Sequence, residues 1–153
     1  MNDSARLDLK DTLDLAIFLE EDEMERYEVL ADRLEGQRTP DGAAFFRYMA
    51  LNEARHRSSL AARRGALFRG SEVDVTRTML GLVGLPAKAF TLRDALEISL
   101  IGEKRAREFF KAAHERVGDP EMQTLFARIA SEETEHERLV QRELDRLPAD
   151  ILG

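Results

Sequence analysis

Two short segments of the sequence pair a glutamate with a histidine three residues later. Glu53 and His56 form one pair, and Glu133 and His136 form the other. In a helix this spacing places both side chains on one face, where a carboxylate and an imidazole can ligate the same metal ion. The chain has no Cys, so any metal site in it must be built from carboxylates and histidines.

Two further glutamates interrupt the apolar stripes of other segments. Glu20 follows Ile17 on the first stripe, and Glu103 precedes Ala106 on the third. The two Glu-x-x-His pairs also continue apolar stripes, so the register predicts that all six side chains point inward. Burial of four unpaired carboxylates would cost on the order of several kcal/mol each, and no Lys or Arg occupies these stripes to pair with them.

Two divalent metal ions would neutralise these carboxylates. Four glutamates contribute a charge of −4 and two divalent ions contribute +4, while two neutral imidazoles complete the coordination. The sequence therefore predicts a two-metal site made of Glu20, Glu53, His56, Glu103, Glu133 and His136. These ligands suit both iron and manganese, so the pattern leaves the metal open, with zinc expected only as an adventitious occupant.

Four helices must bring these residues together. Apolar residues recur at helical spacing, and Gly and Pro fall almost entirely between the periodic segments, which predicts helices over residues 11–35, 41–64, 91–117 and 120–147. Short links within each pair predict two antiparallel hairpins. Residues 65–90 are long enough to cross a whole bundle, and residues 74–83 could form a short helix within that crossover.

The two halves of the chain repeat one another. Residues of the second helix recur 80 positions later in the fourth, and residues of the first recur 83 positions later in the third. The matched positions are Pro40 and Pro120, Phe46 and Phe126, Ala50 and Ala130, Glu53 and Glu133, His56 and His136, then Ala16 and Ser99, Glu20 and Glu103, Tyr27 and Phe110. We interpret this pattern as one helical hairpin used twice.

Composition limits the partners of the protein. The 30 Asp and Glu outnumber the 23 Lys and Arg, and the net charge of −7 argues against binding to nucleic acid. The length of 153 residues suits one domain, and a hydrophobic fraction of 43% is enough for its core. No run approaches the roughly 20 apolar residues of a membrane span, and the first residues do not resemble a signal peptide, so we expect a cytoplasmic protein with no membrane partner.

Other polar residues also need a place in this scheme. Tyr27 lies one heptad after Glu20, where it either fills the core or donates a hydrogen bond to a ligating carboxylate. His114 lies on neither stripe and is expected at the surface. The charged runs 21–25 and 104–108 are expected to form mainly outward faces, with ion pairs between residues four apart.

The sequence resembles the rubrerythrin family of the ferritin-like di-iron carboxylate superfamily, in which two helices each give one Glu and two each give a Glu-x-x-His pair. The resemblance rests on AIFLEEDEMERYEVLA in the first helix, EARH in the second, GEKRAREFF in the third and EETEH in the fourth, and it covers residues 11–147. It implies an all-α, antiparallel four-helix bundle with one long crossover between helices 2 and 3. That bundle would be a single domain over residues 1–153 and would hold two iron ions.

The resemblance also implies a role for each ligand. The bridging or chelating ligands would be Glu53 and Glu133, the ligands that cap one ion each would be His56 and His136, and the terminal ligands would be Glu20 and Glu103. Two features depart from the family pattern. Rubrerythrins usually append an iron site held by four Cys, and this chain has no Cys. Peroxidase members carry a further Glu one turn after the ligand of the third helix, where this chain has Ala106.

Together, the resemblance and the predicted site indicate a non-haem di-iron oxidoreductase. It would react with hydrogen peroxide or dioxygen and would be re-reduced by a separate electron-transfer protein, and we expect a homodimer. The same scaffold also fits a ferroxidase that handles iron, a dimanganese catalase or a substrate hydroxylase. Outside enzymes, a purely structural four-helix adaptor fits the helices, and its lack of bound metal would distinguish it from the others.

Overall fold

The computed structural model describes residues 3–36, 40–69 and 91–148, and helices account for nearly all of them. The four helices are α1 (Asp3–Gly36), α2 (Pro40–Leu67), α4 (Leu92–Arg116) and α5 (Pro120–Arg146). These described ranges contain no strand, which confirms the predicted all-α class. None of the four helices has the long apolar stretch that a membrane crossing requires.

Two predicted helix limits differ from those observed. α1 begins at Asp3 and not near residue 11, and Leu9 gives this extra length a buried anchor because it is only 3% exposed. α2 does not end at Gly65 but continues to Leu67. Phe68 then packs into the core, and its backbone N–H donates to the Arg64 carbonyl at 2.9 Å, so packing outweighs the low helix propensity of glycine.

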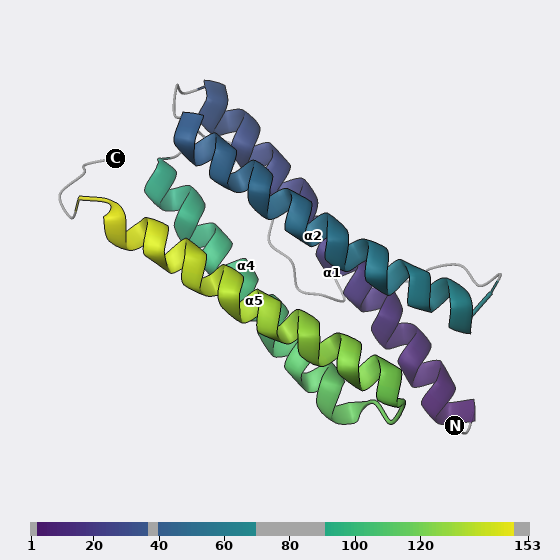
Figure 1. Ribbon diagram of the computed structural model, residues 1–153. Helices are drawn as coiled ribbons and strands as arrows, with labels where there is room; N and C mark the ends of the chain where they lie inside the picture. The colour runs from purple at the N-terminus through teal and green to yellow at the C-terminus, as the bar shows by residue number, and fades with distance from the viewer. Residues whose placement is uncertain (1–2, 37–39, 70–90, 149–153) are drawn as a thin grey trace.

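The helices form two antiparallel pairs, α1 with α2 and α4 with α5, as Figure 1 shows. α2 and α4 run in the same direction, so α2 ends at one end of the bundle and α4 begins at the other. This is the predicted four-helix bundle with one long crossover. The short helix predicted over residues 74–83 lies outside the described residues.

Local sequence fixes where the second pair of helices begins. Thr91 and Asp94 form a capping box at the start of α4, in which each side chain accepts a hydrogen bond from the backbone N–H of the other. Asp119 caps α5 by accepting from the N–H of Met122, and Pro120 occupies the first turn. Such caps typically contribute about 1 kcal/mol each and set the register of the residues that follow.

Two apolar clusters fill the bundle, one toward each end. One contains Leu13, Leu60, Phe110 and Phe126, and the other contains Tyr27, Leu30, Phe46 and Val140. On each helix, the ligand-type residues lie between a residue of one cluster and a residue of the other, as Glu53 and His56 do between Ala50 and Leu60. The fold therefore places a buried polar layer at the middle of an otherwise apolar interior.

Candidate metal centre

The six predicted ligands form one buried cluster at the middle of the bundle. All four glutamates are 0% exposed, and both histidines are 5% exposed. Their ligand atoms form two sets, each within 4.8 Å, and the sets share two glutamates. The first set is Glu20, Glu53, His56 and Glu133, and the second is Glu53, Glu103, Glu133 and His136. Each helix contributes at least one member, so the cluster exists only when all four helices pack together.

The imidazole of His56 faces the first set with one nitrogen and the bundle surface with the other. Its Nδ1 lies 2.8 Å from Glu133, 3.4 Å from Glu53 and 3.5 Å from Glu20. Its Nε2 bonds Glu132, a neighbour of Glu133 that points out of the cluster. A carboxylate at the outer nitrogen fixes the tautomer that leaves Nδ1 free to ligate a metal.

His136 faces the second set in the same way. Its Nδ1 lies 2.8 Å from Oε1 of Glu53, 3.6 Å from Glu103 and 3.7 Å from Glu133. The two histidine rings lie almost parallel, with centroids 5.6 Å apart and planes inclined by 17°. Glu53 turns one oxygen toward each histidine, which is the arrangement that a carboxylate bridging two ions requires.

Many polar atoms of this cluster lack partners within the described chain. Both oxygens of Glu20 and of Glu133, one oxygen each of Glu53 and Glu103, and Nδ1 of His56 have no hydrogen-bond partner there. Buried polar atoms are rarely left without partners in folded proteins, because each costs about 1–3 kcal/mol. Unpaired carboxylate oxygens and an inward imidazole nitrogen form the donor set of a carboxylate-bridged pair of metal ions, so the residues fit such a centre.

The pKa values of the buried glutamates show that four negative charges are unfavourable in this cluster without positive charge beside them. Burial raises the pKa of Glu20, Glu103 and Glu133, and the negative charges of neighbouring carboxylates raise it further. Burial alone would also raise the pKa of Glu53, but its contacts with Glu20 and the histidines outweigh this effect and lower it. Without metal ions, part of the cluster must therefore hold protons.

Burial and the neighbouring carboxylates have opposite effects on the pKa values of the two histidines. Burial by itself would lower their pKa values, yet the adjacent carboxylates raise that of His56 to about 11 and that of His136 to about 9. Protons on the imidazoles thus take the place of metal charge in the apoprotein. Because a ligating imidazole must be neutral, metal binding has to displace these protons.

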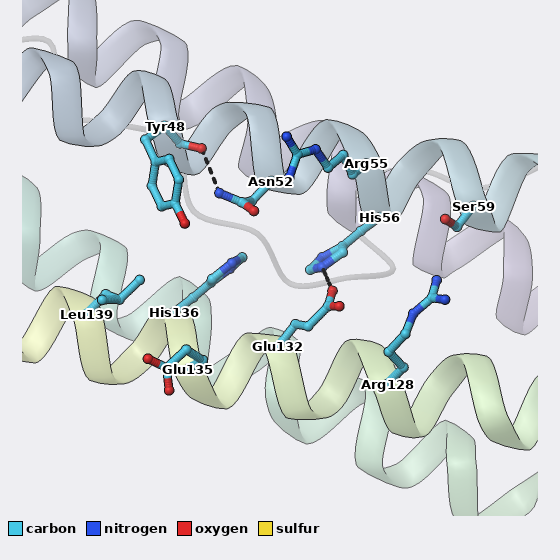
Figure 2. Close-up of a pocket in the computed structure, with 10 residues that line it drawn as sticks. All are labelled: Tyr48, Asn52, Arg55, His56, Ser59, Arg128, Glu132, Glu135, His136 and Leu139. Carbon is cyan, nitrogen blue, oxygen red and sulfur yellow. Dashed lines mark hydrogen bonds and ion pairs between the residues drawn. The ribbon is translucent and has the colours of Figure 1, made fainter.

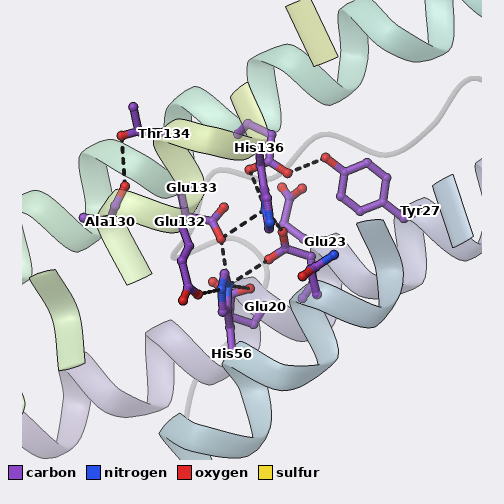
Figure 3. Close-up of polar contacts among 12 residues, drawn as sticks. Glu20, Glu23, Tyr27, His56, Ala130, Glu132, Glu133, Thr134 and His136 are labelled. Carbon is purple, nitrogen blue, oxygen red and sulfur yellow. Dashed lines mark hydrogen bonds and ion pairs between the residues drawn. The ribbon is translucent and has the colours of Figure 1, made fainter. Parts of the chain in front are cut away.

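Tyr27 fills both of the roles considered for it. Its ring packs in the apolar cluster against Phe46, with centroids 5.8 Å apart, and its hydroxyl donates a hydrogen bond to Oε1 of Glu103 (Figure 3). Burial and the charge of Glu103 raise the pKa of the hydroxyl, so it remains a donor. The hydrogen bond holds the Glu103 carboxylate while leaving its other oxygen for a metal ion.

The expected outward face of residues 21–25 is partly wrong, because Asp22 and Glu23 are buried. Glu23 is 1% exposed and lies against Gly102, the residue before Glu103. Two sequence signals could have identified it: the spacing of three from Glu20, and a glycine on the helix that packs opposite. His114 is half-buried and not fully at the surface, and its Nδ1 lies 2.9 Å from the Gln123 carbonyl, away from the cluster.

A pocket of about 380 Å³ opens between α2 and α5 and reaches both histidines (Figure 2). Eight of its ten lining residues have charged or polar side chains. The lining residues are Tyr48, Asn52, Arg55, His56, Ser59, Arg128, Glu132, Glu135, His136 and Leu139. The outer edges of the two imidazoles are thus accessible to small molecules, whereas the four glutamates are not.

Comparisons with solved structures agree with this architecture. An uncharacterized conserved protein from Magnetospirillum magnetotacticum is 28% identical, with a TM-score of 0.81 over 95% of this chain and 99% of that one. A hypothetical protein from Pyrococcus furiosus is 21% identical, with a TM-score of 0.72 over 90% and 88% of the two chains. Bacterioferritin from Rhodobacter capsulatus, solved with a metal-free dinuclear site and haem iron, is 21% identical, with a TM-score of 0.73 over 91% and 84%.

Comparison with protein families gives a match over nearly the whole chain. No curated protein matches the sequence significantly. The family model described as Rubrerythrin, however, matches residues 11–144, a range that contains all four glutamates and both histidines of the buried cluster. The bundle is ferritin-like, as the similarity to bacterioferritin shows. The chain therefore belongs to the rubrerythrin family.

Proposed function

We propose that the protein is a non-haem di-iron oxidoreductase that reduces hydrogen peroxide or dioxygen and is then re-reduced by a separate electron donor. The observation that carries the proposal is the buried cluster of four glutamates and two histidines with unpartnered ligand atoms among the described residues. Membership of the rubrerythrin family supports iron as the metal. Two iron ions would supply the two electrons that convert one hydrogen peroxide molecule to water.

The chain's own residues would hold two ions at fixed positions with a balanced charge. Glu53 and Glu133 belong to both ligand sets and would be shared between the ions. Glu20 with His56 would complete one site, and Glu103 with His136 would complete the other. Four carboxylates neutralise two divalent ions, so the loaded cluster would carry no net charge in the bundle interior.

The pocket between α2 and α5 would admit the oxidant. Two Arg, two Glu, two His, one Asn and one Ser line it, together with Leu139 and Tyr48. A pocket of this size with polar side chains beside both histidines can admit a small polar molecule such as hydrogen peroxide.

Glu132 would connect the centre to solvent. Its carboxylate bonds Nε2 of His56 and is itself exposed, so it links a buried imidazole to the pocket. Reduction of peroxide to water consumes protons, and a carboxylate in this position can receive them from solvent. Electrons would come from a separate protein, since the chain has no Cys with which to build a four-Cys iron site.

Anaerobic loading with Fe(II) followed by stopped-flow mixing tests this function. We expect two Fe(II) per chain, oxidised by one equivalent of hydrogen peroxide, and no reaction by the metal-free protein. Glu121→Gln is a matched control, because Glu121 is exposed on the same helix as Glu133, pairs with Arg63 and does not line the pocket. Absence of iron oxidation by both peroxide and dioxygen would contradict the proposal.

The same experiment separates the alternatives. An iron-handling ferroxidase would continue to oxidise Fe(II) well beyond two per chain and retain the product. A dimanganese catalase would require manganese and would release dioxygen from peroxide. A structural adaptor would bind neither metal tightly.

A further inference from the structure

Glu23 is a fifth buried carboxylate beside the metal centre. It lies on α1 three residues after Glu20, so both side chains project from the same face of the helix. Its side chain is 1% exposed, and its Oε2 has no hydrogen-bond partner within the described residues. Figure 3 shows Glu23 beside the cluster, on the side of Tyr27. A buried carboxylate with an unpaired oxygen requires a counter-charge.

Arg26 does not supply that counter-charge fully. Its Nη1 lies 3.2 Å from Oε1 of Glu23, whereas its Nη2 lies 2.6 Å from Asp22, which is the closer pair. Burial and the charge of Glu103 raise the pKa of Glu23 even though Arg26 acts in the opposite direction. The ion pair therefore leaves Glu23 with one oxygen and part of its charge unmatched.

The helix opposite makes room for Glu23. A Cβ atom added at Gly102 would lie 2.7 Å and 2.9 Å from the two oxygens of Glu23, so any larger residue there would displace the carboxylate. Gly102 directly precedes Glu103, the terminal carboxylate of the His136 ligand set. Glu23 lies outside both ligand sets but close enough to Glu103 for the charge of that carboxylate to raise its pKa.

The repeat between the halves shows that this carboxylate has no counterpart on α4. With the offset of 83 residues, Glu20 matches Glu103, but Glu23 matches Ala106, which is buried in the apolar cluster. By the same offset, Gly102 matches Leu19, which is also buried. Only α1 therefore has both the extra carboxylate and a partner helix with a glycine that accommodates it.

We propose that Glu23 is a seventh ligating residue of the centre, which acts on the ion held by Glu103 and His136. This inference rests on the metal centre of the proposed function but not on its reaction with peroxide. Four glutamates balance two divalent ions, and a fifth carboxylate adds negative charge that favours a trivalent ion at this position. Glu23 would thus make the two metal positions unequal in the charge that they accept.

Metal titration of Glu23→Gln tests the proposal. The substitution keeps the size of the side chain and removes its charge. We expect at least about tenfold weaker binding of one ion of the pair, measured with Co(II), whose absorption spectrum also reports the change in ligands. Glu28→Gln is the matched control because it removes the same charge from an exposed position on α1. Binding of two Co(II) ions by Glu23→Gln with wild-type affinity and spectrum would overturn the proposal.

Gly102→Ala provides an independent test that leaves all carboxylates in place. The added methyl group should displace Glu23 and reproduce the loss of affinity, while in the Glu23→Ala background it should have no further effect. Gly65→Ala is the control, because a Cβ atom there meets nothing within 4 Å. Full additivity of the two substitutions would contradict the proposal.

Arg26→Gln separates ligation from a structural role. If Glu23 served only the ion pair with Arg26, Arg26→Gln and Glu23→Gln would lower the melting temperature alike, and neither would alter the Co(II) spectrum. We expect the spectrum to change only in the Glu23 variant. If Fe(II)-loaded protein fails to reduce peroxide while Glu23→Gln still weakens Co(II) binding, the proposed function fails and this inference stands.

Discussion

The two ligand sets have equivalent residues but different supports. In the His56 set, Glu132 bonds the outer nitrogen of the histidine, and neither oxygen of Glu20 has a hydrogen-bond partner in the described chain. In the His136 set, Tyr27 holds the carboxylate of Glu103 and Glu23 lies beside it. One set thus fixes its histidine and the other fixes its carboxylate.

The supports of the two sets differ at positions that the repeat relates. Glu132 matches Asn52, whose amide donates to the Tyr48 carbonyl at 2.9 Å and not to His136. Tyr27 matches Phe110, which has no hydroxyl to donate. If the repeat is interpreted as one hairpin used twice, the ligands are the same in both halves and the residues around them differ. Supporting residues are where two chemically similar metal positions can acquire different properties.

Loss of a shared ligand should have the largest effect, because it damages both sets. Glu53→Ala and Glu133→Ala should each abolish tight binding of at least one ion, a loss on the order of a hundredfold or more, whereas Glu135→Ala should change little. Isothermal titration with Mn(II) would measure this. Equal losses from all three variants would mean that the register of α5 is wrong.

The success and failure of sequence reasoning have physical causes. Glu53, Glu133 and their histidines could be predicted because they continue apolar stripes, and burial of a charged residue on such a stripe requires a ligand. Glu23 was missed because it lies in the run 21–25, where periodicity alone indicates a solvated face. Its burial depends on Gly102, which belongs to a helix nearly 80 residues away in sequence.

Long-range contacts account for the other missed support. Glu132 lies off the apolar stripe of α5, and nothing in its local sequence indicates a partner. It becomes part of the site only because α2 packs beside α5 and presents the outer nitrogen of His56. Helical periodicity predicts which residues are inward, but it does not predict which outward residues meet across a groove.

A rise in pH should lower the stability of the apoprotein and increase the stabilisation that bound metal adds. In the fold, the pKa values of His56 and His136 are about 11 and 9, above the ordinary 6.5, so their stabilising effect is complete below pH 6.5 and is lost as pH rises through these values. The raised pKa values of Glu20, Glu103 and Glu133 act in the same direction above pH 4.5. The lowered pKa of Glu53 acts oppositely, since its contribution is lost only in acid.

We therefore expect the apoprotein to lose on the order of a few kcal/mol of stability between pH 6 and pH 9. The stabilisation by metal should grow over the same range, because protons compete with the ions for the same atoms. Thermal unfolding with and without Mn(II) at several pH values measures both trends. An apoprotein whose melting temperature rises from pH 6 to pH 9 would show that the cluster does not hold protons.

A carboxylate introduced on α4 at position 106, to match Glu23 on α1, should lower the stability of the protein unless the residue packed opposite is made smaller. Ala106→Glu would place a carboxylate where α1 has Glu23, but Leu19 stands at the position that corresponds to Gly102. Overpacking and burial of the new charge should destabilise the apoprotein by about 1–3 kcal/mol. The double variant with Leu19→Gly should bind metal more tightly than Ala106→Glu alone. Denaturant unfolding and Co(II) titration check both, and an unaffected single variant would refute the packing argument.

The smallest effects should distinguish the supports of the two sets. Glu132→Ala removes the hydrogen bond to His56, and Tyr27→Phe removes the one to Glu103, so each should weaken one ion by about tenfold, equivalent to 1.4 kcal/mol. Because the supports act on different sets, the double variant should weaken both ions and the two effects should add. Asn52→Ala and Tyr48→Phe are the controls, since neither residue bonds a ligand in the described chain. Strong non-additivity would show that the two positions load as one unit, and the difference between them would then have no consequence for metal binding.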